Sequence, residues 1–246
     1  MASALDTDRS AAAAGPGSSV CCSRRGFLQS SVAGVAAGIL TGSGAALAVT
    51  SAARAQTTMN PEAALHEMMA GNRRFVEGRM TSFNDDLKAL KAKTFEKQEP
   101  FGAVLSCADS RVPIELIFDQ SIGRLFVTRV AGNVASSEII ASLEYGVAVL
   151  GTKAIIVMGH ANCGAVKASI DAKAVPGQIS GLYRYIRPAV DQAGRNLEAA
   201  TKANARIQAA LLRESSPVIA DAFKKDQLKV VAAYYDLASG KVSLLD

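Results

Sequence analysis

Histidine and aromatic residues are scarce in this chain of 246 residues, and tryptophan is absent. There are two histidines, His66 and His160, so chemistry that depends on imidazole has few candidate residues. No run of basic residues occurs after residue 55, which argues against a nucleic-acid-binding surface. Hydrophobic residues make up 49% of the chain, enough for one substantial core. We therefore expect a single domain that acts on a small molecule.

The first 55 residues predict an export signal. Ser23-Arg24-Arg25-Gly26-Phe27-Leu28 precedes a weakly apolar stretch over 32–49 that is rich in glycine and alanine, and Ala53-Arg54-Ala55 gives a small-x-small cleavage pattern. This arrangement resembles a twin-arginine signal, which implies the twin-arginine translocase as an export partner. We expect 1–55 to be a signal peptide and 56–246 to be the mature domain.

The expected destination is a periplasm, with a thylakoid lumen as the alternative. An uncleaved membrane anchor is the other interpretation of the stretch over 32–49, which has about the right length to span a bilayer. Glycine and alanine make this segment only weakly hydrophobic for a spanning helix, so a cleaved leader is favoured.

Removal of the leader would leave Cys107 and Cys163 as the only thiols of the chain. In an oxidising compartment such a pair is open to disulfide formation. A metal bound before export would instead hold both sulfurs as thiolates. The two cysteines alone leave both alternatives open, and the nearby histidine favours the metal.

Hydrophobic patterns predict an α/β domain with a mainly parallel central sheet flanked by helices. Three short apolar runs are typical of strands buried on both faces, at 101–107, 125–130 and 154–159. Two more strands are expected at 229–235 and 242–245. The expected helices cover 61–77, a short stretch after 85, 113–119, 136–150, an alanine-rich region over 179–212, and a short stretch after 217.

Cys107 and His160 fall just past two of these strands, at the edge where open α/β sheets bind ligands. Cys163 comes three residues after His160, so three ligand-type residues converge on neighbouring strand ends. Two thiolates and one imidazole are a known ligand set of catalytic zinc sites, which keep a fourth position for water or substrate. The alternatives are two core cysteines with a loop histidine, or a closed site completed by His66.

Asp109 and Arg111 lie two and four residues beyond Cys107, close enough to reach a metal held by that sulfur. Arginine can fix a carboxylate through two parallel hydrogen bonds. Without a metal this would be a surface ion pair worth less than about 1 kcal/mol. Beside zinc, Asp109 could accept the proton of a zinc-bound water and orient the hydroxide. Released from Arg111, it could become an exchangeable fourth ligand that blocks the site.

Cys-x-Asp-Ser-Arg followed by His-x-x-Cys-Gly resembles the β-class carbonic anhydrases. The resemblance covers about 59–245 and includes Gly71-Asn72-Arg73-Arg74-Phe75, Gln98-Glu99-Pro100-Phe101, Ala131-Gly132-Asn133, Ser142-Leu143-Glu144-Tyr145 and Tyr234-Tyr235-Asp236-Leu237. It implies a zinc enzyme that reversibly hydrates carbon dioxide to bicarbonate and a proton. The implied zinc ligands are Cys107, His160 and Cys163, with Asp109 and Arg111 as the catalytic dyad. The first helix would pack on a partner in a homodimer, and dimers could pair into tetramers.

The resemblance also implies three substrate-binding residues. Gln98 matches a glutamine that contacts substrate across the dimer interface, Gly164 would offer its backbone N–H to a substrate oxygen, and Phe126 fits an apolar pocket wall. Each has a plainer alternative: a polar loop residue, a glycine needed by a tight turn, and an inward-facing core phenylalanine.

Some features depart from the family pattern. Arg124 stands where many members carry an acidic residue, and the lack of tryptophan excludes the inhibitory bicarbonate site that some members build around one. His66 is the only other histidine that could shuttle protons, so we expect buffer to carry the proton away.

Two alternative functions remain open. Some members of the family act on carbon disulfide or carbonyl sulfide, and a non-catalytic binding protein is a further alternative. The presence of all three ligands and both dyad residues argues against the last.

Overall fold

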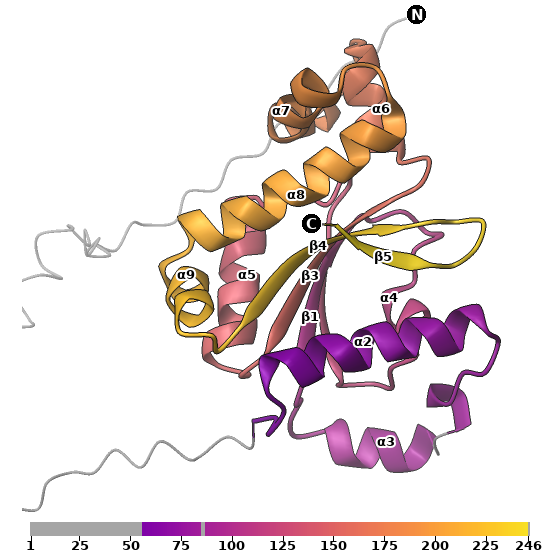
Figure 1. Ribbon diagram of the computed structural model, residues 1–246, viewed down its shortest axis with the longest axis vertical. Coiled ribbons are helices and arrows are strands. Elements are labelled where there is room, and N and C mark those ends of the chain that lie inside the picture. The colour runs from indigo at the N-terminus through magenta and orange to yellow at the C-terminus, as the bar shows by residue number, and fades with distance from the viewer. Residues whose placement is uncertain (1–55, 85–86, 246) are drawn as a thin grey trace, which may run out of the picture. The chain divides into compact units, whose positions relative to one another are not determined.

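The computed structural model describes residues 56–84 and 87–245, so the expected leader lies outside the described residues. Its centre is a five-stranded sheet with the order β2-β1-β3-β4-β5 (Figure 1). The strands are β1 (Gly102–Ser106), β2 (Leu125–Arg129), β3 (Ala154–His160), β4 (Lys229–Tyr235) and β5 (Val242–Leu245). The first four are parallel and β5 is antiparallel to β4, which confirms the predicted α/β fold with a mainly parallel sheet.

Helices cover both faces of this sheet (Figure 1). They are α2 (Pro61–Val76), η1 (Ser82–Asn84), α3 (Leu87–Thr94), α4 (Ile114–Ile117), α5 (Ser137–Ala148), α6 (Gly164–Asp171), η2 (Ile179–Leu182), α7 (Tyr183–Ala193), α8 (Leu197–Ser215) and α9 (Pro217–Lys224). One core layer joins α2 and α4 to the sheet, and a second joins α5, α8 and α9 to the opposite face. Most predicted elements are therefore present, with boundaries that differ by a few residues.

The central strands β1 and β3 are buried at every position. Successive side chains point to opposite faces, so Ile156 packs in the layer beneath α2 while Ile155 and Val157 pack beneath α8. This two-sided burial explains why these strands are continuous apolar runs in the sequence. The predicted third strand ended at Gly159, but β3 continues to His160, which places this histidine on the strand itself.

The alanine-rich helical region predicted over 179–212 consists of three elements, η2, α7 and α8. The chain leaves α7 at Gly194, whose φ of 64° lies in the left-handed region that favours glycine. Asn196 then caps α8, its side chain accepting a hydrogen bond from the Ala199 backbone. Alanine content predicted the helical state, but these two residues set the break.

Four residues fasten α2 to the loop that follows α4, and we call them the α2 anchor: Gly71, Asn72, Arg74 and Asp119. A Cβ atom at Gly71 would lie 1.8 Å from the carbonyl oxygen of Phe118, so only glycine permits this approach. The Asn72 amide donates to the Ile117 and Gly240 carbonyls, at 3.2 and 2.9 Å, and accepts from the Val242 backbone at 2.8 Å. The anchor therefore connects the first helix to the end of α4 and to the turn before β5.

Asp119 completes the anchor through a buried ion pair with Arg74, at 2.5 Å, in which its own side chain is 0% exposed. It also accepts hydrogen bonds from the Thr81 and Ser82 backbone, at 2.9 and 2.8 Å. Burial raises the pKa of the Asp119 carboxyl, but the hydrogen bonds from Arg74 and Ser82 outweigh it and hold this pKa well below its usual range. Through these contacts α2 packs on its own sheet, while its predicted packing on a dimer partner stays a prediction.

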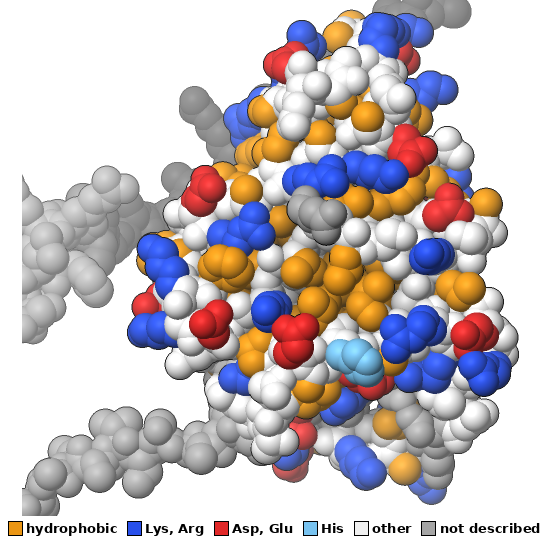
Figure 2. All heavy atoms as spheres, in the orientation of Figure 1, with side chains coloured by type: hydrophobic (Ala, Val, Ile, Leu, Met, Phe, Trp, Pro, Cys, Tyr) orange, Lys and Arg blue, Asp and Glu red, His pale blue; other side chains and the backbone are white. Residues whose placement is uncertain are grey.

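Hydrophobic side chains gather on one face over β4 and β5, between α2 and α8 (Figure 2). Leu244, on the edge strand β5, is 42% exposed there. None of the helices within 56–84 and 87–245 is long and apolar enough to cross a membrane.

Candidate metal centre

Cys107, His160 and Cys163 come together at the carboxyl ends of two adjacent strands. Cys107 follows β1, His160 ends β3, and Cys163 is the N-cap residue of α6. β1 and β3 pair in parallel with Ser106 opposite Met158, so their ends meet at one edge of the sheet. The three ligand atoms all lie within 4.8 Å of one another, and the residues are buried. These three residues could therefore hold a metal ion.

The His160 ring is oriented for coordination through Nε2. Its Nδ1 lies 2.9 Å from the carbonyl oxygen of Ala161, which can only accept, so Nδ1 carries the proton. In the neutral ring this leaves a lone pair on Nε2. Nε2 is buried and has no hydrogen-bond partner among the described residues. A buried, unpaired nitrogen is costly unless a ligand occupies its lone pair, so this atom fits a metal donor.

The two sulfurs also have the separation that a tetrahedral zinc ion requires. Cys107 Sγ and Cys163 Sγ lie 4.0 Å apart, and both cysteines are free. Two thiolates at about 2.3 Å from a tetrahedral ion would be about 3.8 Å apart. A disulfide would bring them to about 2.05 Å. The donor set and its spacing therefore fit zinc. In the structure the two cysteines are not joined by a disulfide.

The contact between the two sulfurs shifts the pKa values of the two thiols in opposite directions. It lowers the pKa of Cys107, against the opposing effect of burial. The same contact, together with burial, raises the pKa of Cys163.

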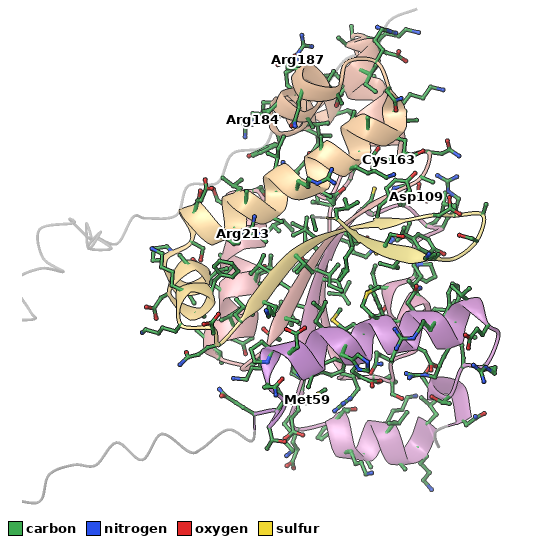
Figure 3. All side chains as sticks on the ribbon, in the orientation of Figure 1. Met59, Asp109, Cys163, Arg184, Arg187 and Arg213 are labelled. Atoms are coloured by element: carbon green, nitrogen blue, oxygen red, sulfur yellow. The ribbon has the colours of Figure 1, made fainter. Side chains whose placement is uncertain are left out.

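Asp109 and Arg111 form a two-pronged ion pair beside the three ligand atoms (Figure 3 labels Asp109 and Cys163). Arg111 Nε donates to Asp109 Oδ1 at 2.9 Å, and a terminal nitrogen of the guanidinium donates to Oδ2 at 2.7 Å. These contacts hold the pKa of Asp109 well below its usual range, so the carboxyl is ionised at neutral pH. The ligand atoms of Cys107, His160 and Cys163 form what we call the donor cluster. Oδ2 lies 3.8 Å from His160 Nε2, which places the carboxylate against this cluster.

Arg129 and Gly132 also contact Cys107, and neither was predicted from the sequence as a site residue. Arg129 Nε, at the end of β2, donates to the Cys107 carbonyl at 3.0 Å. The Gly132 N–H donates to Cys107 Sγ at 3.3 Å. Gly132 was noted only as part of a family motif. Its role depends on a loop conformation that spacing along the chain does not reveal.

Two buried amides on α8, Asn204 and Gln208, were also missed. They are 0% and 1% exposed, and both hydrogen-bond the loop that contains Gly132. The sequence did carry a signal for them, because two amides four residues apart interrupt a helix face that is otherwise apolar except for Thr201.

Of the other predicted residues, none but Gly164 lies beside the donor cluster within one protomer. Gly164 begins α6, and a Cβ there would meet nothing within 4 Å, so no tight turn or close packing accounts for this glycine. Gln98 is exposed and precedes β1, at the end of that strand remote from Cys107. Phe126 lies near the start of β2 and packs against Tyr145 and Gly146. His66 is exposed on α2 and does not join the donor cluster.

Comparisons with known proteins show which family this chain resembles. A family model described as carbonic anhydrase matches residues 102–242. Carbonic anhydrase 2 of Mycobacterium tuberculosis is 33% identical over 195 residues, covering 76% of this chain and 94% of that protein. The carbonic anhydrase of Mycolicibacterium smegmatis is 34% identical over 196 residues, covering 75% and 93%. The Coccomyxa β-carbonic anhydrase structure, at 27% identity, superposes with a TM-score of 0.57 over 74% of this chain and 86% of that one.

Proposed function

This chain belongs to the carbonic anhydrase family, and we propose that it catalyses the reversible hydration of carbon dioxide to bicarbonate and a proton. The observation that carries the proposal is the buried donor set of Cys107, His160 and Cys163, with the unpaired His160 Nε2 turned toward two free sulfurs. These residues would hold one zinc ion. When bound, zinc supplies a Lewis acid that lowers the pKa of a coordinated water.

The Asp109 carboxylate is the proposed proton acceptor of the reaction. Both of its oxygens are engaged by Arg111, so the ion pair fixes the carboxylate against the donor cluster instead of letting it rotate freely. Because its pKa is low, Asp109 stays ionised and can accept a hydrogen bond at Oδ2, the oxygen nearer His160. The side chain of Asp109 is 17% exposed, so buffer can reach it and carry the proton away.

Gly164, Gln98 and Phe126 are the proposed substrate contacts. The open space at Gly164 supports an approach of substrate oxygen to its backbone N–H, at the start of α6. Gln98 and Phe126 lie away from the site of their own protomer, so their proposed contacts require a partner subunit.

We propose a homodimer for this reason, with pairing of dimers as a further step. Exposed aromatic side chains near Gln98 support an interface there, since Phe95 is 88% exposed and Tyr145 is 44% exposed. The exposed apolar side chains over β4 and β5 support a second contact (Figure 2). Light scattering on the purified protein measures the assembly directly, and a monomer at micromolar concentration contradicts this part of the proposal.

Residues 1–55 are proposed to be a twin-arginine signal peptide, and 56–246 the mature enzyme, exported to a periplasm. The support is the Arg24-Arg25 pair, the weakly apolar stretch after it and the cleavage pattern at Ala53-Arg54-Ala55. Replacement of both arginines by lysine should retain the protein inside the cell, as measured by fractionation with an antibody. Unchanged export of the variant contradicts the assignment.

The proposed reaction is tested by stopped-flow measurement of carbon dioxide hydration against pH, alongside an assay of carbon disulfide hydrolysis. We expect hydration that increases toward alkaline pH, because two thiolates acidify a zinc-bound water less than three histidines do. Activity on carbon disulfide alone would overturn the proposed substrate.

A further inference from the structure

The Gly132 N–H contacts the Cys107 sulfur, a proposed zinc ligand, from a segment outside the loop that follows β1. It donates to Cys107 Sγ at 3.3 Å, from the segment that connects β2 to α5. Gly132 has a φ of +77°, and a Cβ atom there would lie 2.7 Å from Ile186 Cδ1. Glycine adopts this φ readily, so contacts from outside the turn are needed to keep its N–H against the sulfur.

Two amides on α8 provide that support. Asn204 Nδ2 donates to the Gly132 carbonyl at 2.8 Å, so Gly132 is held at its oxygen while its own N–H faces Cys107. Gln208 Oε1 accepts from the Ala135 backbone at 2.9 Å, which fixes the far side of the same turn. Hydrogen bonds from α8 thus hold both ends of the segment Gly132–Ala135.

The two amides also hold each other in place. Gln208 Nε2 donates to Asn204 Oδ1 at 3.2 Å and to the Tyr185 carbonyl of α7 at 3.0 Å. With these contacts Asn204 Oδ1 and Nδ2 are both paired, and so are Gln208 Oε1 and Nε2. Leaving a buried amide without partners is costly, so a fully paired network is rigid and has one favoured arrangement.

Packing alone does not require amides at these positions. The rest of the buried face of α8 is almost entirely apolar, and leucine or methionine of similar volume would fill the same space. What an apolar side chain could not do is orient the Gly132 and Ala135 peptide groups. We therefore infer that the amides are needed to orient the Gly132–Ala135 segment toward Cys107.

We propose that Asn204 and Gln208 are positioning residues for the metal centre, which hold the Gly132 N–H against the Cys107 sulfur. The inference rests on the proposed zinc site, which that contact serves. Partners that orient metal ligands typically account for about 10–100-fold in metal affinity. Asn204 and Gln208 act through Gly132 and make no contact with substrate.

The test compares zinc affinity in Asn204→Leu and Gln208→Met with that of the wild-type protein, by competition with a chromophoric chelator. Asn204→Leu keeps the branched shape of the side chain, Gln208→Met keeps its length, and both remove the amide. Asn72→Leu is the matched control, because Asn72 is an equally buried amide with three hydrogen bonds, located on α2. We expect a 10–100-fold weaker zinc affinity in the two α8 variants and no change in Asn72→Leu, although all three lose stability.

A second readout is the thiolate-to-metal charge-transfer band of the cobalt-substituted protein, which should shift in the α8 variants and stay in place in Asn72→Leu. If Asn204→Leu does not fold, Asn204→Ala removes the same amide without filling its place. Zinc affinity and cobalt spectra equal to wild type in folded α8 variants overturn the inference while leaving the proposed function intact. A wild-type protein that binds no zinc overturns both.

Discussion

The metal centre and the α2 anchor are both made of buried polar groups, but they satisfy those groups differently. In the anchor, the Asn72 amide has three backbone partners and Asp119 is held by Arg74 and two backbone N–H groups. At the metal centre, His160 Nε2 has no hydrogen-bond partner among the described residues, and the two sulfurs lie 4.0 Å apart without a disulfide between them. A region whose polar atoms are all paired stabilises the fold, whereas one that leaves donor atoms unpaired is prepared for a ligand.

This difference predicts that changes in the two regions have separate effects. Substitutions at the metal centre should remove metal or activity with the fold retained. Substitutions in the anchor should lower the free energy of unfolding while zinc stays bound.

The largest expected effect is that of Cys107→Ser. Loss of one of three ligands should lower zinc content from about one per chain to near zero and reduce carbon dioxide hydration to the uncatalysed rate. Elemental analysis and stopped-flow assays on the same preparation measure both. Circular dichroism should show the secondary structure retained, and a fully active, zinc-free variant would contradict the ligand assignment.

The next effect is that of Asp109→Asn, which removes the proposed proton acceptor and keeps the side-chain volume. We expect zinc to remain and the hydration rate to fall by about 10²–10⁴-fold, the usual range for a proton-transfer group. Asp171→Asn is the control, because Asp171 also pairs with an arginine, Arg195, but lies outside the donor cluster. Equal rates in Asp109→Asn and wild type would remove Asp109 from the chemistry.

In the anchor, Asp119→Ala should lower the free energy of unfolding by about 3 kcal/mol, the lower end of the range for a buried pair, because Arg74 loses its buried partner but is partly exposed and keeps Glu67. Urea denaturation measures this loss. Zinc content and hydration rate in the folded fraction should match wild type. A loss of zinc comparable to that of Cys107→Ser would mean that the two regions are not separate.

The same residue predicts a pH dependence. The folded-state pKa of Asp119 is lowered, so its stabilisation is present above the unfolded pKa of about 3.9 and is lost as pH falls toward the folded value. Wild-type stability should therefore decrease below about pH 4, and part of that decrease should be missing in Asp119→Ala. Identical acid profiles for the two proteins would contradict the ionised pair.

A smaller effect is expected from Gly71→Ala. The added Cβ would lie 1.8 Å from the Phe118 carbonyl oxygen, so α2 must shift, at a cost of about 1–3 kcal/mol or more. Gly181→Ala is the control, because nothing lies within 4 Å of a Cβ there. Thermal denaturation should show a lowered midpoint for Gly71→Ala and little change for Gly181→Ala. Equal midpoints would mean that the close approach of α2 is not required.

The parts that could be predicted from sequence are those set by local pattern. Continuous apolar runs predicted the central strands, and the helix predicted over 61–77 is α2, which the Asn60 side chain caps. The convergence of Cys107, His160 and Cys163 followed from their positions at strand ends, since parallel strands bring their carboxyl ends to one edge.

What the sequence could not predict depends on contacts between distant segments. Asn204 lies far along the chain from Gly132, and only the folded helix brings its amide to that carbonyl. Gly71 belonged to a recognised motif, but the reason for it, the approach of the Phe118 carbonyl, is tertiary. The break at Gly194 was missed because alanine favours helix on both sides of it.

The most direct test of the central claim is zinc content and carbon dioxide hydration measured together on one preparation of the wild-type protein, before chelation, after it, and after zinc is restored. The account predicts about one zinc per chain, activity that disappears with the metal, and activity that returns with it. Full hydration activity in the metal-free protein would contradict the assignment of Cys107, His160 and Cys163 as a catalytic zinc site.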